Sequence, residues 1–310
     1  MGPVTRSGAK PGRRLRRALL AAALLGAGGA LVFAELQLWQ DRALAAGWRL
    51  QAQAVTGRCR VLDPAGTVAK RGFGAACRAA YLALRPEQAT ARELVILLHG
   101  LGRTPRMFHD LRSALEAEGR QVTALRYASL TAGIEAHGLW LNEVLDRHPR
   151  VAKVSFVTHS LGALVLRAAL ARDPAWRART ALGPVVMLAP PNQGALIARK
   201  LDRWTPTRFI LGPGFADLAE GKPLPAALPA EVALGIIAGG CCEGEGYNPL
   251  LPGDDDGVVR VAETPLEGGD AALRVEALHT FIAEDGDAIA ATRGFLQDGR
   301  LTPAAETDGF

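Results

Sequence analysis

Short apolar stretches alternate with longer amphipathic ones along most of the chain. The apolar stretches have the length and β-branched content of buried strands, and the amphipathic ones have helical spacing. This pattern predicts strands at residues 94–98, 122–126, 152–157, 184–189, 233–238 and 273–276. It predicts helices at residues 106–118, 134–147, 161–171 and 285–298. Such alternation indicates an α/β fold, in which a mostly parallel, doubly wound sheet carries helices on both faces.

One segment interrupts this alternation. Residues 191–230 lie between two predicted strands and contain Trp204, Phe209 and Phe215 among several prolines and glycines. An insertion at the edge of such a sheet is where a lid or substrate-binding cap is built, and its apolar composition would suit an acyl chain. An ordinary pair of helices covering the sheet would have a similar composition, so both interpretations stay open.

The alternating pattern also suggests how the chain divides. Residues 93–298 have the length of a single large α/β domain with a sizeable core. Residues 46–92 give a weaker pattern, and we expect a connecting segment that holds a short strand pair. Residues 299–310 are expected to be a loose tail.

Residues 1–45 combine a basic segment with an apolar one. Six Arg and Lys side chains and no acidic one lie within residues 1–17, and residues 18–34 carry no charge. A positive segment followed by an apolar one is typical of a secretory or membrane-targeting signal, which Trp39 would extend toward an interfacial anchor. We expect export, with an inner-membrane anchor and a periplasmic catalytic domain. Cleavage at the A-x-A match of residues 43–45 would give a secreted protein instead.

The same segment explains the net charge. The chain has 36 Lys and Arg residues against 31 Asp and Glu, a formal charge of +5. Without the six basic residues of the first seventeen, 30 basic residues remain against 31 acidic ones. A nearly neutral body does not offer the basic surface that nucleic-acid binding requires, so no nucleic-acid partner is expected.

The four cysteines are compatible with export. Cys59 and Cys77 flank a short segment and could pair in an oxidising compartment, although small packing residues would look the same. Cys241 and Cys242 are adjacent, and a bond between neighbours demands a strained peptide, so no pairing is inferred. None of the cysteines has a zinc-binding spacing.

A candidate nucleophile follows the third predicted strand. Residues 158–162 read Thr-His-Ser-Leu-Gly and place Ser160 on the sharp turn between the strand and the helix that follows it. Such a turn lifts the hydroxyl clear of the backbone. It also places it near a helix N-terminus, which favours developing negative charge.

A glycine-containing loop follows the first predicted strand. The strand ends in the sequence His99-Gly100-Leu101-Gly102. The glycines let the backbone turn so that amide N–H groups can face a substrate carbonyl. The alternative is a plain strand-to-loop turn with a hydrogen-bonded histidine.

With these motifs in this order, the chain resembles the α/β-hydrolases, and among them the bacterial lipase-like carboxylesterases. Their nucleophile elbow is G-x-S-x-G, and Thr158 takes the place of its first glycine. The resemblance implies that Ser160 is the nucleophile. It also implies that the amides of Leu101 and Leu161 form the oxyanion hole.

In this family the acid and then the histidine follow the serine. His279 is the only histidine C-terminal to Ser160, and it comes just after the last predicted strand. Asp256 fills the D-G-x-V pattern that carries the acid in such lipases and esterases. Its neighbours Asp254 and Asp255 could form a solvated turn, or could help Asp256 bind a cation, although the spacing is not that of a Ca²⁺ loop.

The resemblance therefore implies hydrolysis of a carboxylic ester through an acyl-enzyme. Ser160 attacks, His279 transfers the proton and Asp256 orients the imidazole. No metal or organic cofactor is expected, and the substrate would be an ester or a lipid. Acyl transfer or deacylation of an envelope lipid would use the same triad. A non-catalytic, membrane-tethered binding module on this scaffold is the remaining alternative.

Overall fold

The computed structural model describes residues 37–84, 93–148, 151–225, 227–241, 244–269 and 271–301. The predicted basic and apolar segments, Cys242 and the end of the expected tail lie outside these residues. Among the residues described, no helix is long and apolar enough to cross a bilayer. The chain from Leu38 onward forms one unit.

A parallel sheet of six strands forms the centre of this unit. The strands are β5 (Glu93–Leu98), β6 (Gln121–Leu125), β7 (Lys153–His159), β8 (Ala181–Leu188), β9 (Leu234–Gly240) and β10 (Ala271–Glu276). Their order across the sheet is β10-β9-β8-β7-β5-β6, and every neighbouring pair is parallel. All six predicted strands are confirmed, because a strand buried on both faces reads as a nearly continuous apolar run.

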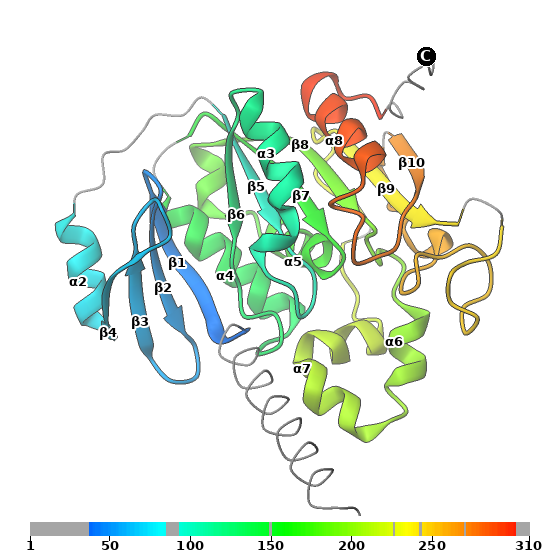
Figure 1. The fold of residues 1–310 in the computed structure, drawn as a ribbon, viewed down its shortest axis with the longest axis horizontal. Helices are drawn as coiled ribbons and strands as arrows, with labels where there is room; N and C mark the ends of the chain where they lie inside the picture. Colours follow the sequence, from blue (N-terminus) through cyan, green and yellow to red (C-terminus); the bar gives the residue numbers. More distant parts are fainter. Residues whose placement is uncertain are drawn as a thin grey trace, which may run out of the picture. The chain divides into compact units, whose positions relative to one another are not determined.

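Helices cover both faces of this sheet (Figure 1). They are α3 (His109–Ala117), α4 (Ile134–Arg147), α5 (Leu161–Leu170) and α8 (Gly286–Asp298), with 3₁₀ turns η1 (Pro105–Phe108), η2 (Ala175–Ala178) and η3 (Val261–Glu263). Phe156 and Met187 pack with α4 and α5 on one face. The next residues along the same strands, Val157 and Leu188, pack with α3 and α8 on the other. The predicted doubly wound architecture is confirmed.

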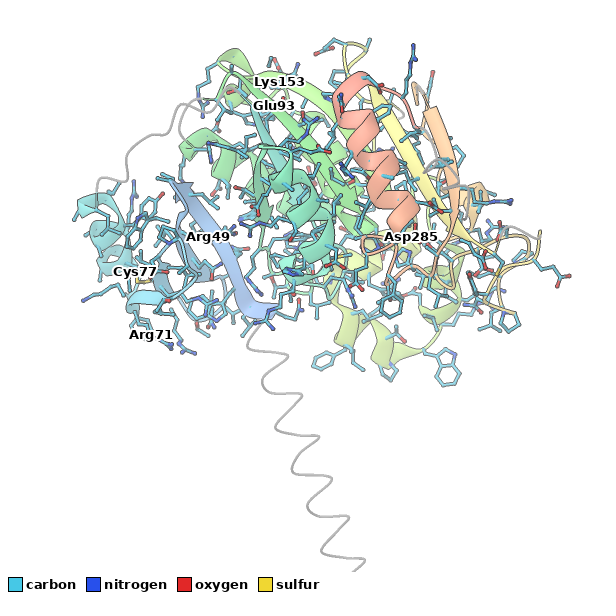
Figure 2. The ribbon with its side chains drawn as sticks, turned by 45° about the horizontal axis from the view of Figure 1, so that its top comes forward. Arg49, Arg71, Cys77, Glu93, Lys153 and Asp285 are labelled. Carbon is cyan, nitrogen blue, oxygen red and sulfur yellow. A yellow bond between two sulfur atoms is a disulfide. The ribbon has the colours of Figure 1, made fainter. Side chains whose placement is uncertain are left out.

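Side chains at the element ends explain where several elements begin. Asp285 caps α8, since its Oδ1 accepts a hydrogen bond from the amide of Ala288 at 2.9 Å. A carboxylate at this position satisfies one of the free N–H groups of the first helical turn. At the start of β5 and β7, Lys153 lies 3.1 Å from Glu93 on the neighbouring strand. Figure 2 labels these three residues.

The predicted insertion at residues 191–230 contains α6 (Leu196–Leu201) and α7 (Thr205–Glu220), which lie beside each other (Figure 1). Helix α7 is kinked at Gly212, where φ is 75°, and Pro213 follows. A Cβ at Gly212 would lie 1.9 Å from the carbonyl oxygen of Leu130, so only glycine fits. The kink separates a half that buries Phe215 in the core from a half whose Phe209 is 92% exposed.

A second, antiparallel sheet precedes the parallel one along the chain. Its strands are β1 (Trp39–Ala45), β2 (Trp48–Gln53), β3 (Arg58–Leu62) and β4 (Val68–Phe73), in that order, and α2 (Ala75–Ala83) follows. A disulfide joins Cys59 to Cys77, and so ties β3 to α2 (Figure 2). Only a strand pair was predicted here, because these strands are short and rich in arginine.

The structure also corrects the expected end of the membrane anchor. Residues 39–45, assigned to the anchor from sequence, form β1. Trp39 is not an interfacial residue, since it is 4% exposed and the guanidinium of Arg60 lies 4.1 Å from the centre of its ring. The predicted anchor, assigned to residues 1–45, is therefore too long by the residues of β1.

Asp41 makes β1 part of the folded body. Its buried carboxylate accepts hydrogen bonds from the side chains of Arg49 and Gln51, and from the amide of Arg126 after β6. The indole of Trp140 on α4 donates to the carbonyl of Asp41 at 2.6 Å. Cleavage at the A-x-A match inside β1 would remove this carboxylate and leave its donors unpaired, which is costly for buried groups.

Candidate active site

Ser160 lies on a strained turn between β7 and α5. Its φ is 51° and its ψ is −122°, a conformation that residues other than glycine rarely adopt. The amide of Ser160 donates to the carbonyl of Leu188 at 2.9 Å and so fixes the turn. A Cβ at Gly162 would lie 2.4 Å from the carbonyl oxygen of Leu98, so a side chain there would push α5 away from β5.

Thr158 fits this turn although glycine is usual at its position. It is buried and pairs with Leu98 on β5 and with Met187 on β8, as a β-branched residue in a central strand can. Its hydroxyl has no hydrogen-bond partner. Threonine in place of glycine at position 158 is therefore compatible with the observed backbone of the turn.

The structure brings His279 to the serine from the loop after β10. The Oγ of Ser160 lies 2.9 Å from Nε2 of His279, and Nδ1 of His279 lies 2.7 Å from Oδ2 of Asp256. A carboxylate only accepts, so Nδ1 carries the proton. Nε2 is then left with a lone pair that can accept the proton of the serine hydroxyl.

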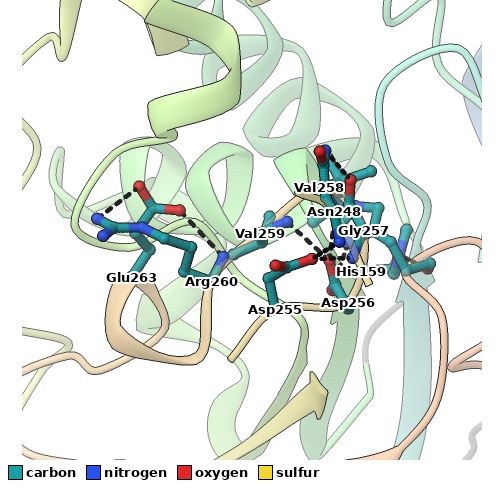
Figure 3. Close-up of polar contacts among 11 residues, drawn as sticks. His159, Asn248, Asp255, Asp256, Gly257, Val258, Val259, Arg260 and Glu263 are labelled. Atoms are coloured by element: carbon teal, nitrogen blue, oxygen red, sulfur yellow. Dashed lines mark hydrogen bonds and ion pairs between the residues drawn. The ribbon is translucent and has the colours of Figure 1, made fainter. Parts of the chain in front are cut away.

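Asp256 is held in place by the backbone of its own loop (Figure 3). Its Oδ1 accepts hydrogen bonds from the amides of Val258 at 3.0 Å and Val259 at 2.7 Å. The carbonyl of Asp256 accepts from the amide of His279 at 2.8 Å. One oxygen of the carboxylate is thus fixed by the loop, which leaves the other to face the imidazole.

The two neighbouring aspartates, Asp254 and Asp255, contact residues other than His279. Asp254 pairs with Arg274 at 2.9 Å and accepts from the amide of Cys241. Asp255 is fully buried, and its Oδ1 accepts from the amides of Asn248 and Gly257 (Figure 3). Burial, and then the nearby carboxylates, raise the pKa of Asp255.

These contacts give the three aspartates different surroundings. A solvated acidic turn is wrong for Asp255, because its side chain is shielded from water. Within the described ranges, no group of three or more His, Cys, Asp or Glu side chains could hold a metal ion. Of the three aspartates, the one in the D-G-x-V pattern contacts the histidine.

The two candidate oxyanion donors come from different loops. Leu161 is the first residue of α5, and so its N–H has no acceptor within the helix. Leu101 lies in the loop after β5 and lines the same cavity as Ser160. The next amide, that of Gly102, donates to the hydroxyl of Ser129 at 2.9 Å, which ties this loop to the segment after β6.

His99 makes hydrogen bonds within this loop and with Tyr127. Its Nδ1 lies 2.9 Å from the carbonyl oxygen of Gly100, and its own carbonyl accepts from the hydroxyl of Tyr127 at 2.6 Å. The two rings stack with their centres 4.3 Å apart. Burial lowers the pKa of His99 to about 3, so the ring is neutral at ordinary pH. The hydrogen-bonded histidine and the glycine-containing loop expected from sequence are therefore parts of one arrangement.

A cavity of about 540 Å³ opens onto Ser160 and His279. Much of its wall comes from the insertion, where α6, α7 and the segment before them contribute apolar side chains. These side chains are Pro191, Ala195, Ile197, Ala198, Leu201, Leu211, Phe215 and Leu218. Leu250, Val258 and Val259 also line the cavity. The arrangement can hold an apolar chain next to a hydroxyl that has a base.

Three further residues of the site were not predicted from the sequence. Arg103 lines the cavity, and its guanidinium reaches the carbonyl of Thr280 at 3.5 Å. Asn248 donates from its side chain to the carbonyl of Gly257 at 2.9 Å and so shapes the aspartate loop. His159 contacts His279. Only its place beside the serine could have pointed to it.

Comparisons with known proteins place this arrangement among known folds. No protein-family model and no curated protein matches the chain. The mature form of the Bacillus licheniformis lipase BlEst2 matches with a TM-score of 0.52 at 16% identity, over 69% of this chain and 94% of that one. The propeptide form of that lipase matches with a TM-score of 0.50 at 16% identity, over 72% of this chain and 54% of that one.

A metagenomic carboxyl esterase, MGS0156, is 23% identical, with a TM-score of 0.47 over 62% of this chain and 65% of that one. At such identities the likeness to the lipase establishes the fold. The chain has the α/β-hydrolase fold, with a helical insertion between β8 and β9. The fold that the motifs indicated is thus confirmed.

Proposed function

We propose that the protein is a serine hydrolase that cleaves carboxylic esters through an acyl-enzyme. The observation that carries this proposal is the continuous chain from Ser160 through His279 to Asp256, with contacts of 2.9 and 2.7 Å. A serine hydroxyl needs a base to take its proton, and the base needs a carboxylate to hold its tautomer. Here Ser160 and His279 line one largely apolar cavity, and the buried Asp256 contacts the imidazole.

In the proposed reaction, Nε2 of His279 takes the proton of Ser160 as Oγ attacks the ester carbonyl. The amides of Leu101 and Leu161 would donate to the oxyanion of the tetrahedral intermediate. The imidazolium then gives its proton to the departing alcohol, and Asp256 stabilises its charge. Water enters by the same base catalysis and releases the carboxylic acid, which restores the free serine.

The cavity supports an acyl chain of moderate length as the substrate's apolar part. Leu201, Leu250 and Val258 line the cavity and are also exposed, so its apolar wall continues to the molecular surface. The insertion carries two further exposed apolar side chains, since Phe209 and Trp204 are 92% and 73% exposed. Exposed apolar side chains around a cavity suit a substrate that is itself poorly soluble, such as a lipid ester.

A panel of p-nitrophenyl esters tests the proposal. We expect kcat/KM of the full-length protein, kept soluble in a mild detergent, to rise from acetate to about hexanoate or octanoate. The gain per added methylene should be up to about fourfold, as expected for burying a CH₂ group. Ala198→Trp, which would fill the buried α6 side of the cavity, should move the optimum to shorter chains. An absence of hydrolysis for every ester would contradict the proposal.

We also propose that the catalytic body is exported and remains tethered to the inner membrane by residues before Trp39. Three observations support this: the basic and apolar order of residues 1–34, the disulfide between Cys59 and Cys77, and the burial of the A-x-A match in β1. If cleavage releases the body instead, it should occur before Trp39, because β1 contributes Asp41 to the core.

Reporter fusions to the C-terminus test this topology. A reporter that works only in the periplasm should be active, and one that works only in the cytoplasm should not. The mass of the membrane-bound protein should be that of the uncleaved chain. Recovery of full-length protein from the soluble cytosolic fraction would contradict the proposal, and a mature N-terminus after Ala45 would contradict the role of β1.

A further inference from the structure

The residue before the nucleophile contacts the loop that carries the base. Nε2 of His159 lies 2.8 Å from the backbone carbonyl oxygen of His279, and the two rings lie 4.7 Å apart between their centres. A carbonyl only accepts, so Nε2 of His159 carries a proton and donates it. The last residue of the strand that positions Ser160 thus holds the backbone of His279 directly.

This contact completes the fixation of His279. On one side the amide of His279 donates to the carbonyl of Asp256 at 2.8 Å. On the other its carbonyl accepts from His159, and its ring contacts both Asp256 and Ser160. Without His159, the carbonyl of His279 would lose this hydrogen bond, while the aspartate loop and the contact of Arg103 with the carbonyl of Thr280 would remain.

The second ring nitrogen of His159, Nδ1, makes no hydrogen bond. Nδ1 is buried and without a hydrogen-bond partner, and a Cβ at Gly100 would lie 2.8 Å from it. A protonated ring would need a partner for both nitrogens. Burial, and next the proximity of the His279 ring, hold the pKa of His159 well below its usual range. The ring therefore stays neutral, with its one N–H directed to His279.

We propose that His159 is a positioning residue for the general base: its Nε2–H holds the carbonyl of His279 so that the imidazole stays within reach of Ser160. The inference rests on the proposed ester hydrolysis. It assigns to the second residue of the elbow motif a role in the chemistry, exerted through the backbone of His279. Loss of this contact should affect turnover more than substrate binding, because His159 donates to the loop of the base.

The test compares variants that differ in where a donor remains. His159→Leu removes the N–H, and we expect kcat on p-nitrophenyl butanoate to fall about 100-fold, the size of effect that a displacement of about 1 Å produces. KM should stay within about threefold. His159→Gln keeps an N–H near the place of Nε2 and should recover kcat to within about tenfold of the original protein. His159→Asn places its donor near Nδ1 and should not.

Controls separate this role from packing and from the proposed activity. Thr292 on α8 is also fully buried with an unpartnered polar atom, and Thr292→Val should change kcat less than about twofold. Melting temperatures are recorded for every variant, and assays are run well below them. If His159→Leu does not fold, the comparison of His159→Gln with His159→Asn still decides.

The proposal is overturned if folded His159→Leu keeps kcat within about threefold of the original protein, or if His159→Asn is as active as His159→Gln. It is supported if activity follows the position of the donor while KM stays nearly constant. Failure of the proposed function itself would be distinct, because the unmodified protein would then hydrolyse none of the esters.

Discussion

Replacement of Ser160 by alanine is expected to lower kcat for ester hydrolysis by about 10⁴-fold or more, because the members of a triad act as a unit. The fold should stay intact. The turn at Ser160 has a φ of 51°, and alanine meets there the same backbone strain as serine. The measurement is kcat on a short-chain ester, together with covalent labelling by a fluorophosphonate, which should be lost in the variant.

Ser113 offers a matched control for this variant. It lies on α3, and its hydroxyl donates only to the carbonyl of His109 one turn earlier. Ser113→Ala should keep both labelling and activity. Labelling that persisted in Ser160→Ala would mean that another serine is the nucleophile, and the site would have to be reassigned.

Asp256→Asn is expected to lower kcat by about 10⁴-fold, as a neutral substitute for the triad acid does. Oδ2 of Asp256 accepts from Nδ1 of His279 at 2.7 Å. An amide NH₂ at this place would face the N–H of the imidazole, and two donors cannot pair. The imidazole would then carry its proton on Nε2, the nitrogen that faces Ser160. The hydroxyl would then have no base.

The neighbouring aspartates should respond far less. Asp255→Asn keeps the oxygen that accepts from Asn248 and Gly257, and Asp254→Asn loses only the charge of its pair with the partly exposed Arg274. We expect kcat of both variants within about tenfold of the original protein. Measurement of all three at saturating ester, with thermal melts, separates lost chemistry from misfolding. A dead Asp254→Asn or Asp255→Asn beside an active Asp256→Asn would overturn the assignment.

The local sequence pattern was enough to predict the parallel sheet and the order of the candidate residues. Strands buried on both faces must be apolar along their whole length, and the helices between them must be amphipathic, so local pattern alone located β5 to β10 and α3, α4, α5 and α8. The motifs around Ser160 were equally readable. A turn with a φ of 51° and a helix pressed on Leu98 restrict which residues fit at neighbouring positions.

Contacts between segments that are far apart in the chain could not be predicted from the sequence and are seen only in the folded structure. Asp41 looks like one charge near a membrane signal, and only its contacts with Arg49, Gln51 and Arg126 show that β1 belongs to the body. The D-G-x-V pattern singled out Asp256 among three adjacent aspartates, but the contacts of Asp254 with Arg274 and of Asp255 with Asn248 appear only in the folded chain.

For the same reason, the contact of His159 with His279 could not be predicted from the sequence. Its partner is a backbone carbonyl 120 positions along the chain, and a carbonyl leaves no mark in the sequence. Side-chain patterns record burial and backbone conformation, because these constrain the residue itself. Hydrogen bonds to a distant backbone constrain only one of the two partners, and so they become visible only when the chain is folded.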